Sequence, residues 1–304
     1  MSQASPVTTM AATLGDAAVV SPSRPPRPGA GAFMKVVREP IGLIGLVIIV
    51  TLIVVAILAP VIAPYPPDDQ PGRRLESPNS TYWLGTDDLG RDIFSRLLYG
   101  ARVSLQVGII AVGIALVIGG ILGLLSGYYV GIVDALVQRL VDILLAFPTL
   151  ILVIALTTVM GASTATAMIA IGIAYSPAIA RVVRGATLQV RQEQYVEAGK
   201  TIGVGPSRMI LRHIVPNIAP PVIVQSTLLL STAILAEAAL SFLGLGTQPP
   251  AASWGAMLGA GRKYMETAPW VAIFPGLAIS ITVLGFNLLG DAMRDALDPR
   301  LRQR

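Results

Sequence analysis

Residues 41–63 form an apolar run of 23 residues that contains no charged side chain. Crossing the hydrocarbon core of a membrane takes about 20 helical residues, and in lipid the backbone polar groups must be satisfied within the helix. The run therefore predicts a transmembrane helix and excludes an ordinary globular domain. With five further apolar segments, we predict an all-α, polytopic membrane protein with six transmembrane helices. The predicted spans are residues 41–63, 103–126, 137–160, 165–180, 218–245 and 270–289.

The basic residues predict the orientation of these spans. With both termini in the cytoplasm, 14 of the 22 Lys and Arg residues lie on the cytoplasmic side and 7 outside, with Arg139 at the edge of a span. Cytoplasmic loops carry the excess of Lys and Arg, so we expect this orientation. Residues 64–102 are then an extracytoplasmic segment and residues 181–217 a cytoplasmic loop. Because the basic residues are scattered over loops, they do not indicate a nucleic-acid partner.

The first 34 residues are rich in Ala, Ser, Pro and Gly and show no apolar periodicity. Such a composition cannot bury enough apolar surface to offset the entropy of ordering. We therefore expect residues 1–34 to form a disordered cytoplasmic tail.

The cytoplasmic loop has local structure of its own. Helix-forming residues predominate from Ala178 to Ile202, and a Gly-Val-Gly-Pro sequence at residues 203–206 ends that helix. A second helix can restart at Pro206, because proline is tolerated in a first helical turn, and is expected to run until Pro216. We therefore predict a helix-turn-helix at the membrane surface, with Glu197 and Lys200 at its exposed tip.

The extracytoplasmic segment ends in an amphipathic stretch, residues 83–98. Thr86 or an aspartate beside it can cap a helix, with Leu89 and Ile93 on its apolar face and charged residues on the other. The stretch predicts a helix that lies at the membrane interface. Its candidate functional residues are Asp87, Gly90, Arg91, Asp92 and Arg96.

Several residues within the spans depart from the apolar pattern. Gly119, Gly123 and Gly127 recur at four-residue spacing and predict a face packed against another helix. Glu237 is an ionisable group at membrane depth, which is costly, so it either pairs with a neighbouring helix or lines a substrate pathway. Prolines within spans, including Pro148, predict kinks that serve gating or shape alone. The candidate pathway and gating residues are Glu237, Gln225, Pro177 and Asn287.

The sequence contains no motif for catalysis or for ATP binding. It lacks the G-x-x-x-x-G-K-[ST] loop that holds ATP phosphates, so a motor driven by ATP must be another chain. The chain has no cysteine, its one histidine is His213, and it lacks the motifs of metallopeptidases and serine hydrolases. We therefore name no catalytic or metal-binding residue and expect no cofactor in this chain. An intramembrane enzyme is disfavoured for the same reason.

Four sequence blocks resemble the C-type permease subunits of dipeptide/oligopeptide-type bacterial ABC importers. The first runs from Glu197-Ala198-Gly199 through Gly203 to Pro216 and is similar to the "EAA" loop of such subunits. It departs from the usual pattern in three places, at Gly199, His213 and Val215. The other blocks are residues 83–96, residues 240–255 and residues 287–300, and together the resemblance covers residues 35–302.

The resemblance implies a type I ABC importer fold, with residues 35–302 as the permease transmembrane domain. It also implies that the loop is a coupling helix, which docks into an ATPase subunit. The residues expected to serve this coupling are Glu197, Ala198, Gly199, Lys200, Gly203 and Pro216. The implied complex contains a second, B-type permease, two P-loop ATPase subunits that bind ATP and Mg, and an extracytoplasmic substrate-binding protein. The resemblance also implies that the chain spans the lipid bilayer of the bacterial plasma (inner) membrane.

The sequence leaves two alternatives open. Relatives of this kind carry dipeptides, longer peptides, glutathione or nickel complexes, so the substrate is not determined. The main alternative function is a self-sufficient secondary transporter, a class often built from inverted repeats with charges at the membrane midplane. No internal repeat is evident and Glu237 stands nearly alone, which favours a driven, non-catalytic subunit of a larger complex.

Overall fold

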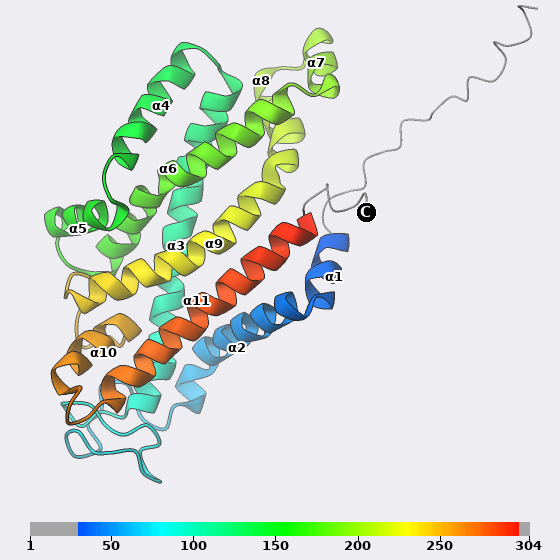
Figure 1. Ribbon diagram of the computed structural model, residues 1–304. Coiled ribbons are helices and arrows are strands. Elements are labelled where there is room, and N and C mark those ends of the chain that lie inside the picture. The colour runs from blue at the N-terminus through cyan, green and yellow to red at the C-terminus, as the bar shows by residue number, and fades with distance from the viewer. Residues whose placement is uncertain (1–29, 298–304) are drawn as a thin grey trace, which may run out of the picture.

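The computed structural model describes residues 30–297, and every regular element within them is a helix. The long helices pack against one another, two of the short helices lie against their sides, and the other short helices and loops lie at their ends (Figure 1). The predicted all-α class is therefore confirmed. The long helices are α2 (Pro40–Ile62), α3 (Ile93–Tyr128), α6 (Thr164–Arg191), α9 (Val215–Phe242) and α11 (Trp270–Leu297). The short ones are α1 (Ala30–Arg38), α4 (Ile132–Leu145), α5 (Thr149–Met160), α7 (Gln194–Thr201), α8 (Pro206–Met209), the π-helical turn Ile210–Ile214, α10 (Trp254–Gly261) and the 3₁₀ turn Arg262–Tyr264.

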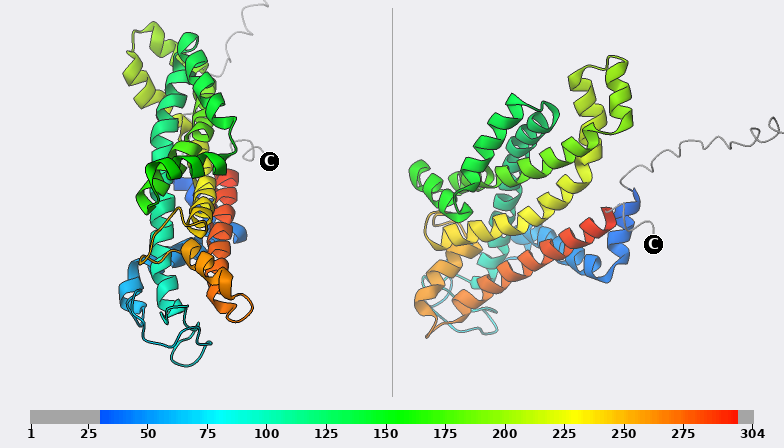
Figure 2. Two further views of the ribbon diagram at one scale, coloured as in Figure 1. Left: turned by 90° about the vertical axis from the view of Figure 1, so that its left-hand side faces the viewer. Right: turned by 45° about the horizontal axis from the view of Figure 1, so that its top comes forward.

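The long helices place two groups of short elements far apart. α11 contacts α2 on one side and α9 on the other, and α9 also contacts α3 and α6. The views in Figure 2 show α7 at one end of the molecule and α10 with the loop of residues 63–92 at the opposite end. We call these the α7 end and the α10 end.

The five long helices are each long and apolar enough to cross a membrane, but the third predicted span is not one straight helix. α4 and α5 meet there at an angle of 89°. Pro148 is the N-cap of α5, and the residue before a proline is disfavoured in helical conformation, so the helix breaks at this point. Counting the bent pair as one span gives six. Pro177, by contrast, is buried inside α6, which continues through it.

The close packing of α3 on α6 confirms the prediction from the glycine spacing. A Cβ atom added at Gly123 would lie 2.6 Å from the carbonyl oxygen of Ala180, and one added at Gly127 would lie 2.6 Å from Cβ of Thr187. Gly119 faces the carbonyl oxygen of Ser176 in the same way. The missing side chains let the two helix backbones approach each other directly.

The predicted interfacial helix before the second span is wrong. Residues 63–92 form a loop with turns, and α3 begins at Ile93 and runs without a break for 36 residues. The cap is Asp92, whose side chain accepts a hydrogen bond from the backbone N–H of Ser95 at 2.8 Å. Gly85 and Gly90 have φ angles of 79° and 82°, which a right-handed helix cannot contain.

Other helix boundaries also differ from the predicted ones. α6 passes the expected end at residue 180 and reaches Arg191, and α11 continues through the predicted separate tail helix to Leu297. Pro299, predicted to end that tail helix, lies outside the described residues. Residues 30–34 of the predicted disordered tail belong to α1, and residues 1–29 lie outside the described part of the chain.

Candidate functional site

A helical hairpin at the α7 end carries the predicted coupling residues. α6 stops at Arg191, Glu193 is extended, and α7 follows from Gln194. Gly203 then turns the chain with a φ angle of 78°, and the backbone N–H of Val204 closes the end of α7 on the carbonyl of Gly199 at 3.0 Å. Pro206 opens α8. The predicted turn between two helices at Gly203 is confirmed, but the predicted continuous helix from Ala178 to Ile202 is wrong, because the chain breaks it at residues 192–193.

The hairpin is packed rather than loose. Val196, Met209 and Ile214 are all 1% exposed or less, and they belong to the same apolar cluster as Val190 near the end of α6. A Cβ atom added at Gly199 would lie 2.6 Å from the end of the Met209 side chain, so α7 approaches α8 closely there. The tip is therefore held on a buried apolar base.

The same packing turns the tip outward. Glu197, Ala198, Lys200 and Gly203 are exposed, and Gly199 is half-buried. The ion pairs found among residues 34–297 do not involve Glu197 or Lys200, so both charges are free to meet another surface. The sequence prediction missed Ile202, whose side chain is 80% exposed at the tip.

Two further residues complete the description of the hairpin. Tyr195 is partly exposed on α7, and its partial burial and the Glu193 carboxylate raise its pKa, so the phenol stays neutral at physiological pH. Pro216 is not at the tip and does not end the second helix. It lies in the first turn of α9, which the chain reaches through a wider π-helical turn, in which the N–H of Val215 bonds to the carbonyl of Ile210.

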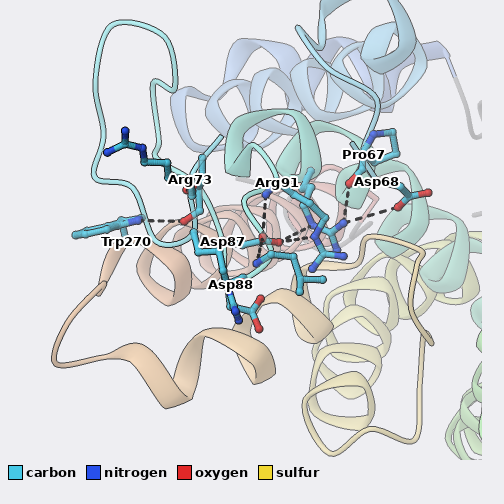
Figure 3. A network of polar contacts seen from close by, with 11 residues as sticks. Pro67, Asp68, Arg73, Asp87, Asp88, Arg91 and Trp270 are labelled. Atoms are coloured by element: carbon cyan, nitrogen blue, oxygen red, sulfur yellow. Dashed lines mark hydrogen bonds and ion pairs between the residues drawn. The ribbon is translucent and has the colours of Figure 1, made fainter. Parts of the chain in front are cut away.

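The predicted residues at the α10 end form a polar network within the loop of residues 63–92 (Figure 3). The carboxylate of Asp87 accepts hydrogen bonds from the backbone N–H groups of Leu89 and Arg91, at 2.9 and 3.0 Å, and from Nε of Arg91 at 2.7 Å. Nε of Arg96 lies 3.6 Å from the same carboxylate, and its Nη1 donates to the carbonyl of Pro67 at 2.7 Å. Asp87 and Arg91 thus satisfy each other within the loop, whereas Nε of Arg96, a residue of α3, is buried and makes no hydrogen bond among the described residues. The network gives the loop a fixed shape.

The loop is folded back on itself and tied to the helices at two points. Gly90 faces the carbonyl of Gly72, another loop residue, with no room for a side chain. The backbone N–H of Tyr65 donates to Oγ of Ser95 in α3 at 3.2 Å. The indole N–H of Trp270, the first residue of α11, donates to the carbonyl of Thr86 at 3.4 Å. The loop is therefore anchored at both α3 and α11.

The four candidate pathway residues do not come together. Glu237 is 1% exposed, and its carboxylate accepts hydrogen bonds from Ser241 at 2.7 Å and Ser104 at 3.2 Å, so it is sealed between helices. Asn287 of α11 accepts a hydrogen bond from Ser231 of α9 at 2.8 Å. Gln225, by contrast, lines a hollow of about 620 Å³ between α6, α9 and α11.

The sequence of this chain matches known membrane components of transport systems. The family described as "Binding-protein-dependent transport system inner membrane component" matches residues 119–303. The dipeptide transport system permease protein DppC of Alkalihalophilus pseudofirmus is 46% identical over 276 residues, which cover 90% of this chain and 91% of that protein. The chain belongs to this family of inner membrane components. Residues 28–78 also match the "N-terminal TM domain of oligopeptide transport permease C".

Further relatives of this inner membrane component have the same subunit type. The glutathione transport system permease protein GsiD of Pectobacterium atrosepticum is 44% identical over 270 residues, covering 88% of this chain and 90% of that one. GsiD of Escherichia coli O157:H7 is 44% identical over 293 residues, covering 96% and 97%. Among solved structures, the MetNI methionine ABC transporter in inward-facing conformations matches with a TM-score of 0.55 and 20% identity, over 68% of this chain and 98% of that one.

These matches confirm the main prediction. The chain is a multi-pass permease subunit of a bacterial ABC importer, with the type I importer fold. As such it is a non-catalytic membrane subunit that works with a partner permease and ATPase subunits. The secondary-transporter alternative is not supported.

Proposed function

We propose that the importer carries short peptides, either dipeptides or glutathione, which is itself a tripeptide. The observation that carries this proposal is the identity of 44–46% with permeases named for these two substrates, over about nine tenths of the chain. Nickel complexes receive no support from these relatives. A binding protein that delivers the peptide from outside would set much of the selectivity.

We further propose that α7 is the coupling helix. The exposed side chains of Glu197, Ala198 and Lys200 form a small charged surface, and Ile202 beside them can enter an apolar depression of a partner. Gly199 and Gly203 shape this surface by letting α7 approach α8 and by making the turn. The partner that docks on this surface is an ATPase subunit that binds ATP and Mg. The complex would contain two such subunits, one below each of the two permeases. Pro216 lies away from this surface, in the first turn of α9, and would serve coupling by shaping the passage from the hairpin into α9.

The proposed orientation puts the α7 end and both termini in the cytoplasm. Six Lys and Arg residues between positions 181 and 217 support it, because basic loops stay inside. The loop of residues 63–92 then faces the outside and offers exposed apolar residues, Trp83 and Leu89, to the binding protein. The network of Asp87, Arg91 and Arg96 would hold that surface in shape.

One face of α9 is proposed as this chain's wall of the pathway, which a second, B-type permease would complete. Gln225 lines the hollow near the α7 end, and Thr232 and Ala239 line a second hollow of about 530 Å³ farther along. These three residues are seven apart and share a helix face. The amide of Gln225 would be costly if it faced lipid, whereas in a pathway it can bind peptide backbone groups. The hydroxyl of Thr232 donates to the carbonyl of Leu229 at 2.9 Å and can still accept a hydrogen bond from a peptide. Glu237, Pro177 and Asn287 would support this wall from behind.

Reconstitution tests the proposal. The chain is co-expressed with the permease and ATPase genes adjacent to its own, purified, and placed in lipid vesicles with the binding protein. We expect uptake of labelled dipeptide or glutathione that requires ATP and Mg, and a complex with two permeases and two ATPase subunits. Uptake by this chain alone, driven by a proton gradient without ATP, would overturn the proposal.

A further inference from the structure

The first half of the third span is attached to the protein by polar side chains. On α4, Asp134 and Gln138 lie four residues apart and so share one face of the helix. The carboxylate of Asp134 accepts two hydrogen bonds from Arg184 of α6, from Nε and from Nη2, both at 2.7 Å. Nε2 of Gln138 donates to the hydroxyl of Ser126 of α3 at 3.0 Å. α4 is thus joined to both of the helices beside it.

A third contact continues the row. Asp142, four residues after Gln138, accepts a hydrogen bond from Nη2 of Arg181 of α6 at 2.8 Å. We call the three contacts the polar ladder of α4. Their strengths differ, because the side chains of Asp142 and Arg181 are about half exposed, at 54% and 55%, and exposed pairs contribute little. Asp134 is 14% exposed and its bond to Arg184 is bidentate, so this pair is the main one.

Apolar packing contributes little to holding α4 against α3 and α6. Val141 is the one buried residue of α4, all of which the structure describes. Large apolar side chains on the opposite face are exposed, among them Leu136 at 69% and Ile143 at 53%. Without the ladder, α4 would have little to fix its position on α3 and α6.

The helices to which α4 is tied form one unit. α3 and α6 meet backbone to backbone at the glycines of α3, Gly119, Gly123 and Gly127. α6 continues through a two-residue turn into α7. At its other end α4 meets α5 at 89°, at Pro148, which has no N–H to continue the helix. Any movement of α7 that shifts α6 therefore shifts α4 as well, and the bend at Pro148 takes up the difference.

We propose that the polar ladder makes α4 part of the α3–α6 unit, so that the first half of the third span moves with the helix that leads into α7. Asp134 and Arg184 are then positioning residues for ATP-driven transport. The inference rests on the proposed coupling role of α7, and extends it to a part of the chain that neither the ATPase nor the substrate has to touch.

Charge reversal tests the main pair. In the reconstituted complex, Asp134→Arg or Arg184→Asp is expected to lower peptide uptake per ATP hydrolysed by at least about fivefold, the low end of ordinary coupling between sites. The double variant, which restores opposite charges in exchanged positions, is expected to recover most of the uptake. Arg139→Asp is the matched control, because Arg139 is exposed on the same helix and outside the ladder.

Recovery of uptake in the double variant distinguishes a role in positioning α4 from a general loss of folding. The co-purified amount of ATPase is measured for every variant and is expected to stay unchanged. Single variants that keep the normal ratio of uptake to ATP hydrolysis would overturn the proposal, and so would a double variant no better than the singles.

A reversible cross-link tests the movement itself. The chain has no cysteine, so Ser126→Cys with Gln138→Cys introduces one defined pair between α3 and α4. If α4 moves with α3, uptake after oxidation is expected to equal that of the oxidised parent complex. If uptake stops on oxidation and returns with reductant, α4 must move relative to α3 and the proposal fails.

The role of α7 is judged separately, with Gly203→Asp at its tip. Normal coupling in that variant, together with a loss in Asp134→Arg, would overturn the coupling role of α7 and leave the ladder standing. The opposite pattern would overturn the ladder alone. In either case the cross-link reports directly on the movement of α4.

Discussion

The carboxylate of Glu237 in α9 accepts a hydrogen bond from the hydroxyl of Ser104 in α3, at 3.2 Å, although the two residues are 133 positions apart. Ser241 donates to the same carboxylate at 2.7 Å, and it also accepts a hydrogen bond from the backbone N–H of Thr247 at 3.0 Å. Glu237 thereby fastens α3, α9 and the loop after α9 together. This position explains how an acidic residue is tolerated at membrane depth.

Removing the Glu237 carboxyl should therefore reduce stability. Glu237→Leu leaves the buried hydroxyls of Ser104 and Ser241 without their acceptor, and each buried unpaired group costs about 1–3 kcal/mol. We expect a lower midpoint of thermal unfolding for the purified complex in detergent. Gln225→Leu is the control, because Gln225 borders a hollow and should affect uptake more than stability. Equal unfolding midpoints for Glu237→Leu and the parent would contradict the structural role.

The glycine contact between α3 and α6 gives a second prediction. In Gly123→Ala the new Cβ would lie 2.6 Å from the carbonyl oxygen of Ala180, which belongs to a backbone that cannot easily shift. Overpacking of this kind costs about 1–3 kcal/mol. Gly120→Ala on the same helix meets nothing within 4 Å and should be neutral or slightly stabilising. The measurement is thermal unfolding, and similar values for the two variants would show that α3 and α6 are farther apart.

The positions of the long helices could be predicted because an uncharged run of about 20 residues has few alternatives in a membrane. The start of α3 could not. Thr86, Asp87 and Asp92 are all suitable caps, and the choice of Asp92 depends on the positive φ angles of Gly85 and Gly90. Those angles accompany the close approach of the backbone at Glu76 and Gly72, which local sequence does not reveal.

The candidate site was predictable to a similar extent. The exposed tip at Glu197 and Lys200 followed from polar residues around a glycine turn, whereas Ile202 was missed because an apolar residue there could equally have packed inside. For Glu237 the sequence left two roles open. The structural one is favoured by Ser104, a partner too distant in sequence for any local pattern to indicate.

The turn of the hairpin gives a third prediction. Gly203 has a φ angle of 78° and open space around it, so a side chain fits but costs about 1–2 kcal/mol in backbone strain. We expect Gly203→Asp to fold and assemble, yet to uncouple uptake from ATP hydrolysis, because the new charge lies on the docking surface. Gly203→Asn separates the two effects, since asparagine tolerates this backbone conformation and carries no charge. If the asparagine variant loses coupling as fully as the aspartate variant, shape rather than charge decides docking.

The proposed pathway wall gives the last prediction. Thr232 of α9 is exposed and borders the hollow of about 530 Å³ between α5, α6, α9, α10 and α11, so a large side chain there should fill the space without disturbing the buried face of the helix. We expect Thr232→Trp to reduce peptide uptake strongly while the unfolding midpoint and the ATPase content stay unchanged. Ile223→Trp is the matched control, because Ile223 is also exposed on α9, at 45%, but borders neither of the two hollows along this helix. Normal uptake by both variants would mean that peptide crosses along another face, and a loss of uptake in both would mean that any bulk on α9 disturbs assembly with the partner permease.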